Sequence, residues 1–198
     1  MDVYLVIATQ IALLAFLQFG EAFLPSTFVA RKLCHAGSGL LMLQLDSHDA
    51  VARVFVYSVV VTSLALTWRL LPGAPVLRFG VEFDAGITIY LLLVAFWFSA
   101  LQPVAALAPL FFADPAGAVF GKLASSHGFN MVWYENKTVV GTLAVFTVAF
   151  LCVDVPALGA RAGVAAACAA AEAFGGRTFD NALIAVPALS SWIFFHGW

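Results

Sequence analysis

One short stretch of the chain combines residue types that could hold a metal ion and a polyphosphate. In "FFADPAGAVFGK", residues 111–122, an apolar run meets Asp114, and Gly117 and Gly121 follow at i+3 and i+7, on one stripe if the segment is helical. A carboxylate suits a hard cation, and Lys122 adds a point charge for phosphate oxygens. Small residues would let a ligand approach the backbone, but they are equally typical of a helix-packing face.

A second basic segment follows in "YENKTVVGT", residues 134–142, where we expect a polar loop. Lys137, Thr138 and Gly141 complete a set of one acid, two lysines and accessible backbone, which is what a magnesium–polyphosphate needs. The chain has neither G-x-x-x-x-G-K-[ST] nor G-x-G-x-x-G, so the two common soluble nucleotide cradles are excluded.

Two further groups of polar residues flank this centre. In "RKLCH", Arg31 and His35 are one helical turn apart with Lys32 beside them, which predicts either a phosphate clamp or a juxtamembrane basic anchor. In "EAFGGRTFDN", Glu172 precedes a glycine pair and Asp180-Asn181 opens the next apolar run. Asp180 is then a helix cap, a metal ligand or a base, and Glu172 is a candidate for a second metal or proton-handling role.

The composition sets the environment in which these groups must work. Of the 198 residues, 63% are hydrophobic and 10% are charged, against about 25% charged in a typical soluble domain. We therefore predict an all-α, polytopic integral membrane protein with a single transmembrane catalytic domain, residues 1–198. A net charge of −2 without a basic tract argues against nucleic acid as a partner. Cys34, Cys152 and Cys168 have no paired or metal-binding spacing, so they are read as packing residues.

Eight apolar runs are candidate membrane spans, several of them short, and seven remain if the "LQP" break is only a kink. The runs are Val3–Phe19, Phe28–Leu45, Val51–Leu71, Gly86–Leu101, Pro103–Gly121, Thr138–Val153, Ala157–Phe174 and Ala182–Phe195. No loop between them is long enough for a soluble domain. Any chemistry must therefore use span ends and connecting loops.

The distribution of positive charge predicts the topology. If the runs alternate across a membrane, one face receives Arg31, Lys32, Arg69, Arg78, Lys122, Lys137 and Arg177, and the other receives only Arg53 and Arg161. Lys and Arg accumulate in cytoplasmic loops, so both termini are predicted outside or lumenal, with the basic face cytosolic or equivalent. Most of the unusual acids fall on this same face, which indicates one site there. The Asn136-Lys137-Thr138 glycosylation acceptor would then be cytosolic and unmodified.

These motifs, in this order, resemble the CTP-dependent lipid-alcohol kinases: dolichol, phytol and farnesol kinases and a fungal-type diacylglycerol kinase. The family pattern has an early R-K-x-x-H, a central D-x-x-A-x-x-x-G, a K-[ST]-x-x-G-[ST] and a D-N pair. The matching residues are Arg31, Lys32, His35, Asp114, Gly121, Lys137, Thr138, Gly141, Thr142, Asp180 and Asn181. Gly117 replaces the family alanine, and Ser125 replaces a second glycine. The wording "NKTVVGT" is closest to the phytol kinase subgroup.

The resemblance implies transfer of the γ-phosphate of CTP, with Mg²⁺, to the hydroxyl of an isoprenoid alcohol such as phytol. Asp114 would hold the metal, and Asp180 would be a second ligand or the base. Lys122 and Lys137 would bind phosphates under a closing group of Arg31, Lys32 and His35, with Glu172 and Asn181 in support. The alternatives are a phosphatidate cytidylyltransferase-like enzyme, a diacylglycerol kinase and, outside enzymes, a small transporter.

Overall fold

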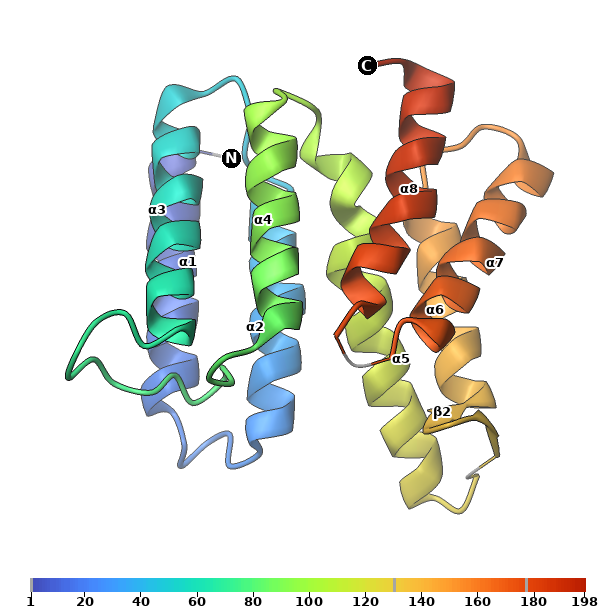
Figure 1. The fold of residues 1–198 in the computed structure, drawn as a ribbon, viewed down its shortest axis with the longest axis horizontal. Coiled ribbons are helices and arrows are strands. Elements are labelled where there is room, and N and C mark those ends of the chain that lie inside the picture. The colour runs from blue at the N-terminus through green and yellow to red at the C-terminus, as the bar shows by residue number, and fades with distance from the viewer. Residues whose placement is uncertain (1, 130, 177) are drawn as a thin grey trace. The chain divides into compact units, whose positions relative to one another are not determined.

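A computed structural model describes residues 2–129, 131–176 and 178–198, and it is mostly helical (Figure 1). The described residues form eight α-helices, one 3-10 turn and one two-stranded antiparallel ribbon. The elements are α1 Val3–Phe19, α2 Thr27–Met42, α3 Ala50–Thr67, α4 Ala85–Ser99, η1 Val104–Leu107, α5 Ala108–Ser126, β1 Val132–Tyr134, β2 Lys137–Thr138, α6 Val139–Cys152, α7 Leu158–Phe174 and α8 Asp180–His196. The predicted all-α class is confirmed.

The helices follow the predicted apolar runs closely because polar side chains fix where many of them begin. Five helices start after a residue whose side chain accepts a hydrogen bond from a backbone N–H of the first turn. These capping residues are Asp2, Ser26, Asp49, Asp84 and Thr138. The capping oxygens satisfy donors that the helices themselves leave unpaired.

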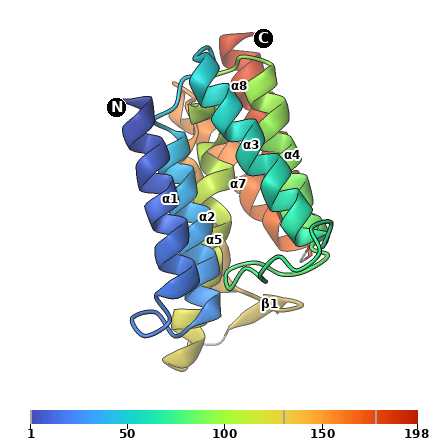
Figure 2. The same ribbon diagram turned by 90° about the vertical axis from the view of Figure 1, so that its left-hand side faces the viewer.

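The chain divides into two compact units, Met1–Val104 and Ala105–Trp198, and each is described by itself. In the first unit, α1 packs against α2 and α3, and α3 packs against α4 (Figure 2). The catalytic domain expected over residues 1–198 stays a prediction. The site described below is built within the second unit.

The second unit is a four-helix arrangement in which α5, α6, α7 and α8 pack in chain order and α8 returns to α5. Its buried cluster consists of Ala113, Val145, Ala149, Ala165, Cys168, Ala169, Ile184 and Ala188. Small side chains predominate in this cluster, so the helices approach closely. The α6–α7 and α7–α8 connections are short, and the segment leading into α6 meets the end of α7 through the contact of Lys137 with Glu172.

Two segments of the described chain, Ala50–Thr67 and Val104–Ser126, are long and apolar enough to cross a membrane. Three shorter helices are also apolar: Val3–Phe19, Ala85–Ser99 and Val139–Cys152. Length and composition alone give these assignments.

The structure differs from the sequence prediction around the fifth run. This run was expected to end at Gly121, with Asp114 near its edge, but α5 continues to Ser126, so Asp114 lies well inside the helix. The residues "KLASS" are compatible with a helix although they are no longer apolar. The loop expected before α6 also contains structure, since β1 and β2 pair through Val132–Thr138 and Tyr134–Lys137.

Candidate functional site

Most of the predicted site residues of the second unit lie at helix ends, where α6 and α8 begin and where α5 and α7 end. Lys122 is near the end of α5, Lys137 and Thr138 lead into α6, Glu172 is near the end of α7, and Asp180 and Asn181 open α8. Of these positions, Lys137 and Glu172 are in direct contact, and Gly175, three residues after Glu172, lies against Asp180. A polar end on a unit built from apolar helices is therefore a candidate site.

The ammonium group of Lys137 forms an ion pair with the carboxylate of Glu172. The pair is largely buried: 17% of the Lys137 side chain and 7% of the Glu172 side chain are exposed. A buried carboxylate needs such a partner, because an unpaired charge in a low-dielectric environment is costly. Glu172 thus holds Lys137 in this structure, and its predicted metal-binding role stays a prediction.

The β1–β2 hairpin positions Lys137 for this contact. Tyr134 is the cross-strand partner of Lys137, and its ring packs edge-on against Phe174 at a centroid distance of 4.9 Å. The Trp133 ring also packs against Phe174, at 6.1 Å, and its indole N–H donates to Thr142 Oγ1 at 2.8 Å. The aromatic contacts and the ion pair thus fix the hairpin to the end of α7.

The start of α8 is formed by Asp180 and Asn181. Asp180 is not the helix cap that its position suggested: the cap position is Phe179, and Asp180 Oδ1 instead accepts from the Asn181 backbone N–H at 2.8 Å. Gly175 makes this tight turn possible, because a methyl group there would lie 2.6 Å from the Asp180 Cα. Asn181 Oδ1 is buried and has no hydrogen-bond partner among the residues described here.

Asp114 is buried in α5, with 6% of its surface exposed. Its neighbour Ala113 and Ile184, one turn after Asp180, belong to the same buried cluster. In Figure 1 the start of α8 lies at the level of the middle of α5, and the two helices are in contact. The interior position of Asp114 in its helix is therefore compatible with a shared site at the start of α8.

The oxygen donors of this region fit a magnesium ion. The described part of the chain contains no cluster of three or more His, Cys, Asp or Glu arranged as a metal site. Magnesium does not require one, because it is commonly held by one or two carboxylates together with substrate phosphates and water. The buried, unpartnered Asn181 oxygen beside Asp180 is the donor type that such an ion uses. Asp114, Asp180 and Asn181 are the residues that fit.

The glycines of the opening motif lie close to the start of α6. A methyl group at Gly117 would lie 2.5 Å from Val145 Cγ2, and one at Gly121 would lie 2.9 Å from Thr138 Oγ1. A methyl group at Gly141 would lie 2.9 Å from the Gly117 carbonyl oxygen. The space beside all three glycines is thus filled by the facing helix. The contacts show close packing of α5 on α6, the alternative that the spacing left open, and the predicted cofactor-binding role of the three glycines stays a prediction.

Thr138, also predicted to bind the cofactor, caps α6. Its buried hydroxyl accepts from the Gly141 backbone N–H at 3.0 Å. Thr138 therefore fixes the start of the helix that follows Lys137, and we assign it this structural role.

Gly141→Ala is expected to destabilise the protein by about 1–3 kcal/mol, because the added methyl group meets a backbone carbonyl that cannot rotate away. Thermal unfolding in detergent measures the effect. Gly163→Ala is the matched control: nothing lies within 4 Å of its added methyl group, so the loss of glycine should leave the helix unchanged or stabilise it by up to about 1 kcal/mol. Equal unfolding midpoints for the two variants would contradict the packing role.

The "RKLCH" residues belong to the first unit. Arg31 forms an ion pair with Asp84 at 2.6 Å, and Asp84 also caps α4 by accepting from the Ile87 N–H at 3.1 Å. The His35 ring packs edge-on against Tyr90 at 4.6 Å. Arg31 thus has a structural partner within its own unit. That Arg31, Lys32 and His35 close over bound phosphates stays a prediction.

Substitutions at Asp84 separate the two roles of this contact. Asp84→Ala removes the cap and the ion pair and should lower stability by about 1 kcal/mol, whereas Asp84→Asn keeps a capping oxygen and should cost less. If Arg31 also binds phosphate, Arg31→Ala raises the KM for the nucleotide and Asp84→Asn does not. Steady-state kinetics and thermal unfolding of the three variants check this expectation.

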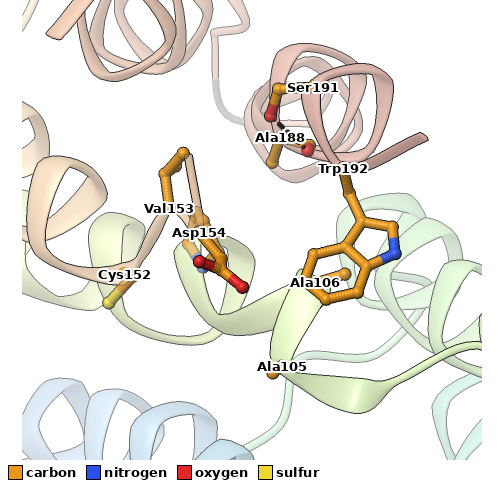
Figure 3. Close-up of a pocket in the computed structure, with 9 residues that line it drawn as sticks. Ala105, Ala106, Cys152, Val153, Asp154, Ala188, Ser191 and Trp192 are labelled. Atoms are coloured by element: carbon orange, nitrogen blue, oxygen red, sulfur yellow. Dashed lines mark hydrogen bonds between the residues drawn. The ribbon is translucent and has the colours of Figure 1, made fainter. Parts of the chain in front are cut away.

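A small hollow lies where α5 begins and α6 ends (Figure 3). It is bordered by the start of α5, the end of α6 and the second half of α8, with Asp154 and Trp192 among its lining residues. His196 approaches the Asp154 backbone carbonyl at 3.0 Å and its carboxylate at 3.5 Å. None of the predicted site residues lines this hollow, so we assign it no part in the site.

Comparison of the chain with known proteins finds no matching family model, no matching curated protein and no matching solved structure.

The aromatic residues of the hairpin were missed by the sequence reading. A signal was present, because "VWY" is rich in β-branched and aromatic residues and is followed by the turn-forming pair Glu135-Asn136. Three residues are too few to establish the alternation of apolar and polar side chains that identifies a β-strand.

Proposed function

We propose that this chain is a membrane lipid-alcohol kinase that transfers the γ-phosphate of CTP to the hydroxyl of an isoprenoid alcohol. The observation that carries the proposal is the polar end of the second unit, where the buried Lys137–Glu172 pair lies on the same side as the Asp180–Asn181 start of α8. A lysine, carboxylates and an unpartnered amide oxygen on apolar helices suit a polyphosphate and a cation at a lipid surface.

The proposal places all eight helices in the membrane, with the termini outside or lumenal and the polar end on the cytosolic or equivalent face. The composition supports this placement, as do the two segments long enough to span and the three shorter apolar helices. The excess of Lys and Arg in alternate loops supports the orientation. Glycosylation of Asn136 in a eukaryotic expression host would show that the orientation is the opposite of the proposed one.

The residues of the chain would divide the chemistry as follows. Lys137 binds donor phosphates. The acceptor oxygen bonds to the γ-phosphorus as the bond to the CDP leaving oxygen breaks, and Asp180 accepts the hydroxyl proton if it is the base and not a second metal ligand. Asp114, Asp180 and Asn181 would hold Mg²⁺, which neutralises charge on the phosphates when bound. Phosphoryl transfer needs positioning and electrostatic stabilisation more than covalent participation by the protein.

The donor and acceptor are proposed from the motif resemblance, since the residue chemistry does not distinguish CTP from ATP. The match to the phytol kinase subgroup favours a short isoprenoid alcohol over dolichol or diacylglycerol.

The proposal is tested with purified protein in detergent. The protein is given γ-labelled CTP or ATP together with phytol, farnesol, dolichol or diacylglycerol in turn. Label on the lipid is expected with CTP and phytol or farnesol. Label released as pyrophosphate would instead identify a cytidylyltransferase, and label on diacylglycerol alone would identify a diacylglycerol kinase.

A small transporter is the second candidate, and the position of Asp114 favours it. Buried acids in the interior of an apolar helix are typical of ion and proton pathways, and Asp114 is both buried and inside α5. Proton or cation uptake into proteoliposomes, dependent on Asp114 and without any nucleotide turnover, would favour transport over the kinase.

A further inference from the structure

The segment that joins α5 to α6 exposes large apolar side chains where the sequence predicts a polar loop. Phe129 and Met131 are 71% and 69% exposed, and Phe120, Leu123 and Trp133 are each exposed by 45–50%. We call these five residues the apolar hairpin surface. Exposed apolar patches of this kind mark contact with a membrane, a ligand or another protein.

The α5 part of this surface is an outward face of the helix. Phe120 and Leu123 are three residues apart and exposed, while Gly117 and Gly121 are buried against α6. This half of α5 is therefore packed on one side, and its open side carries Phe120 and Leu123 together with the exposed Lys122.

In the hairpin, the exposed part of the Trp133 ring carries no polar group that lacks a hydrogen-bond partner. The indole N–H of Trp133 already donates to Thr142 Oγ1, so the exposed remainder of the ring is apolar. The exposed part of this ring therefore suits an apolar environment such as acyl chains.

The polarity changes abruptly at the turn of the hairpin. Glu135 and Asn136 are both exposed and directly follow β1. On the other side, the apolar surface is continuous with Val104–Ser126, one of the two segments long and apolar enough to cross a membrane. A surface that continues an apolar span and ends at charged and amide side chains matches a lipid interface better than a protein partner.

We propose that the apolar hairpin surface lies in the acyl–headgroup boundary of the membrane, with the Glu135-Asn136 turn facing water. The inference rests on the membrane location within the proposed function and not on the kinase activity. It fixes Lys137 at the depth where a lipid alcohol presents its hydroxyl. The hairpin is then an interfacial anchor beside the site.

This placement is tested in lipid nanodiscs with an environment-sensitive fluorophore attached to Met131→Cys. The background variant has Cys34, Cys152 and Cys168 replaced by alanine. Asn136→Cys is the aqueous control and Phe120→Cys is the control on α5. Lipids carrying a nitroxide near the top of the acyl chain are the quencher. We expect blue-shifted, quenched emission at position 131 and green, unquenched emission at position 136.

Each other outcome overturns the inference in a distinguishable way. Green emission at 131 places the hairpin in water, and blue but unquenched emission means that protein, such as a second copy of the chain, covers it. Quenching at 120 without quenching at 131 rejects the hairpin anchor alone, whereas loss of quenching at both positions also rejects the membrane location.

A second measurement does not depend on the cysteine-free background. The difference in intrinsic fluorescence between the native chain and Trp133→Phe isolates the Trp133 emission. We expect the nitroxide lipids to remove most of this difference. A difference signal that is unaffected by these lipids would overturn the proposal.

Discussion

Asp114→Asn is expected to abolish lipid-alcohol phosphorylation while leaving expression and helical content intact. The substitution keeps the shape of the side chain but removes the charge that would hold the cation. Metal-ion stabilisation of transferring phosphate is worth several kcal/mol, and about 1.4 kcal/mol is a factor of ten in rate. A loss of roughly a thousandfold in kcat/KM is therefore expected. Turnover of γ-labelled CTP with a saturating alcohol measures it.

Asp154→Asn provides the matched control for Asp114→Asn. Asp154 is an acid of the same unit, but it lies beside the hollow at the opposite end. Its neutralisation should leave phosphorylation close to the native rate. Near-native turnover by Asp114→Asn would rule out the assigned metal role, and equal losses in both variants would indicate a general effect of charge on the fold.

The helices were the most predictable feature of this chain. Apolar runs bounded by residues such as Ser26, Asp49 and Asp84 predicted helix starts closely, because capping is a local interaction between neighbours in the sequence. The end of α5 was less predictable. An apolar run and a helix need not end together, and the polar residues from Lys122 to Ser126 still favour helical backbone.

The glycine motif shows why the site was harder to predict than the fold. Gly117 and Gly121 have the spacing of a backbone-access stripe, and the same spacing serves helix packing. The residue that decides between these readings is Gly141, which lies in the next helix and contacts both glycines only after folding. Sequence spacing along one helix does not contain that information.

The Lys137–Glu172 contact was predictable only in part. Alternation of the helices placed both residues on one face, and the structure confirms that they share one end of the unit. Their direct pairing depends on the hairpin, whose Trp133 and Tyr134 pack on Phe174. The residues are 35 positions apart, so no local pattern could have predicted that Glu172 pairs with Lys137.

Lys137→Ala is expected to raise the KM for the nucleotide about 10–100-fold, because a charge-assisted hydrogen bond contributes about 1.5–3 kcal/mol. It should also destabilise the protein, since Glu172 would keep a buried carboxylate without its partner. Breaking a buried ion pair by removing one member costs about 3–5 kcal/mol. Donor titrations and thermal unfolding in detergent measure the two effects separately.

The double variant Lys137→Met/Glu172→Leu separates binding from stability. Replacing both charges with apolar side chains of similar size removes the uncompensated carboxylate, so stability should return to near the native value. The KM for the nucleotide should stay as high as in Lys137→Ala, because the phosphate-binding charge is still absent. Recovery of both properties would mean that Lys137 has only a structural role.

Glu172→Gln then decides how Glu172 itself takes part. If its carboxylate holds Lys137, the neutral amide frees the lysine for phosphate, and the KM for the nucleotide should fall or stay unchanged while kcat is retained. If Glu172 were a metal ligand, the same substitution would reduce kcat and raise the magnesium concentration needed for half-maximal rate. A magnesium titration of Glu172→Gln beside Asp114→Asn distinguishes a carboxylate that positions a lysine from one that binds the cation.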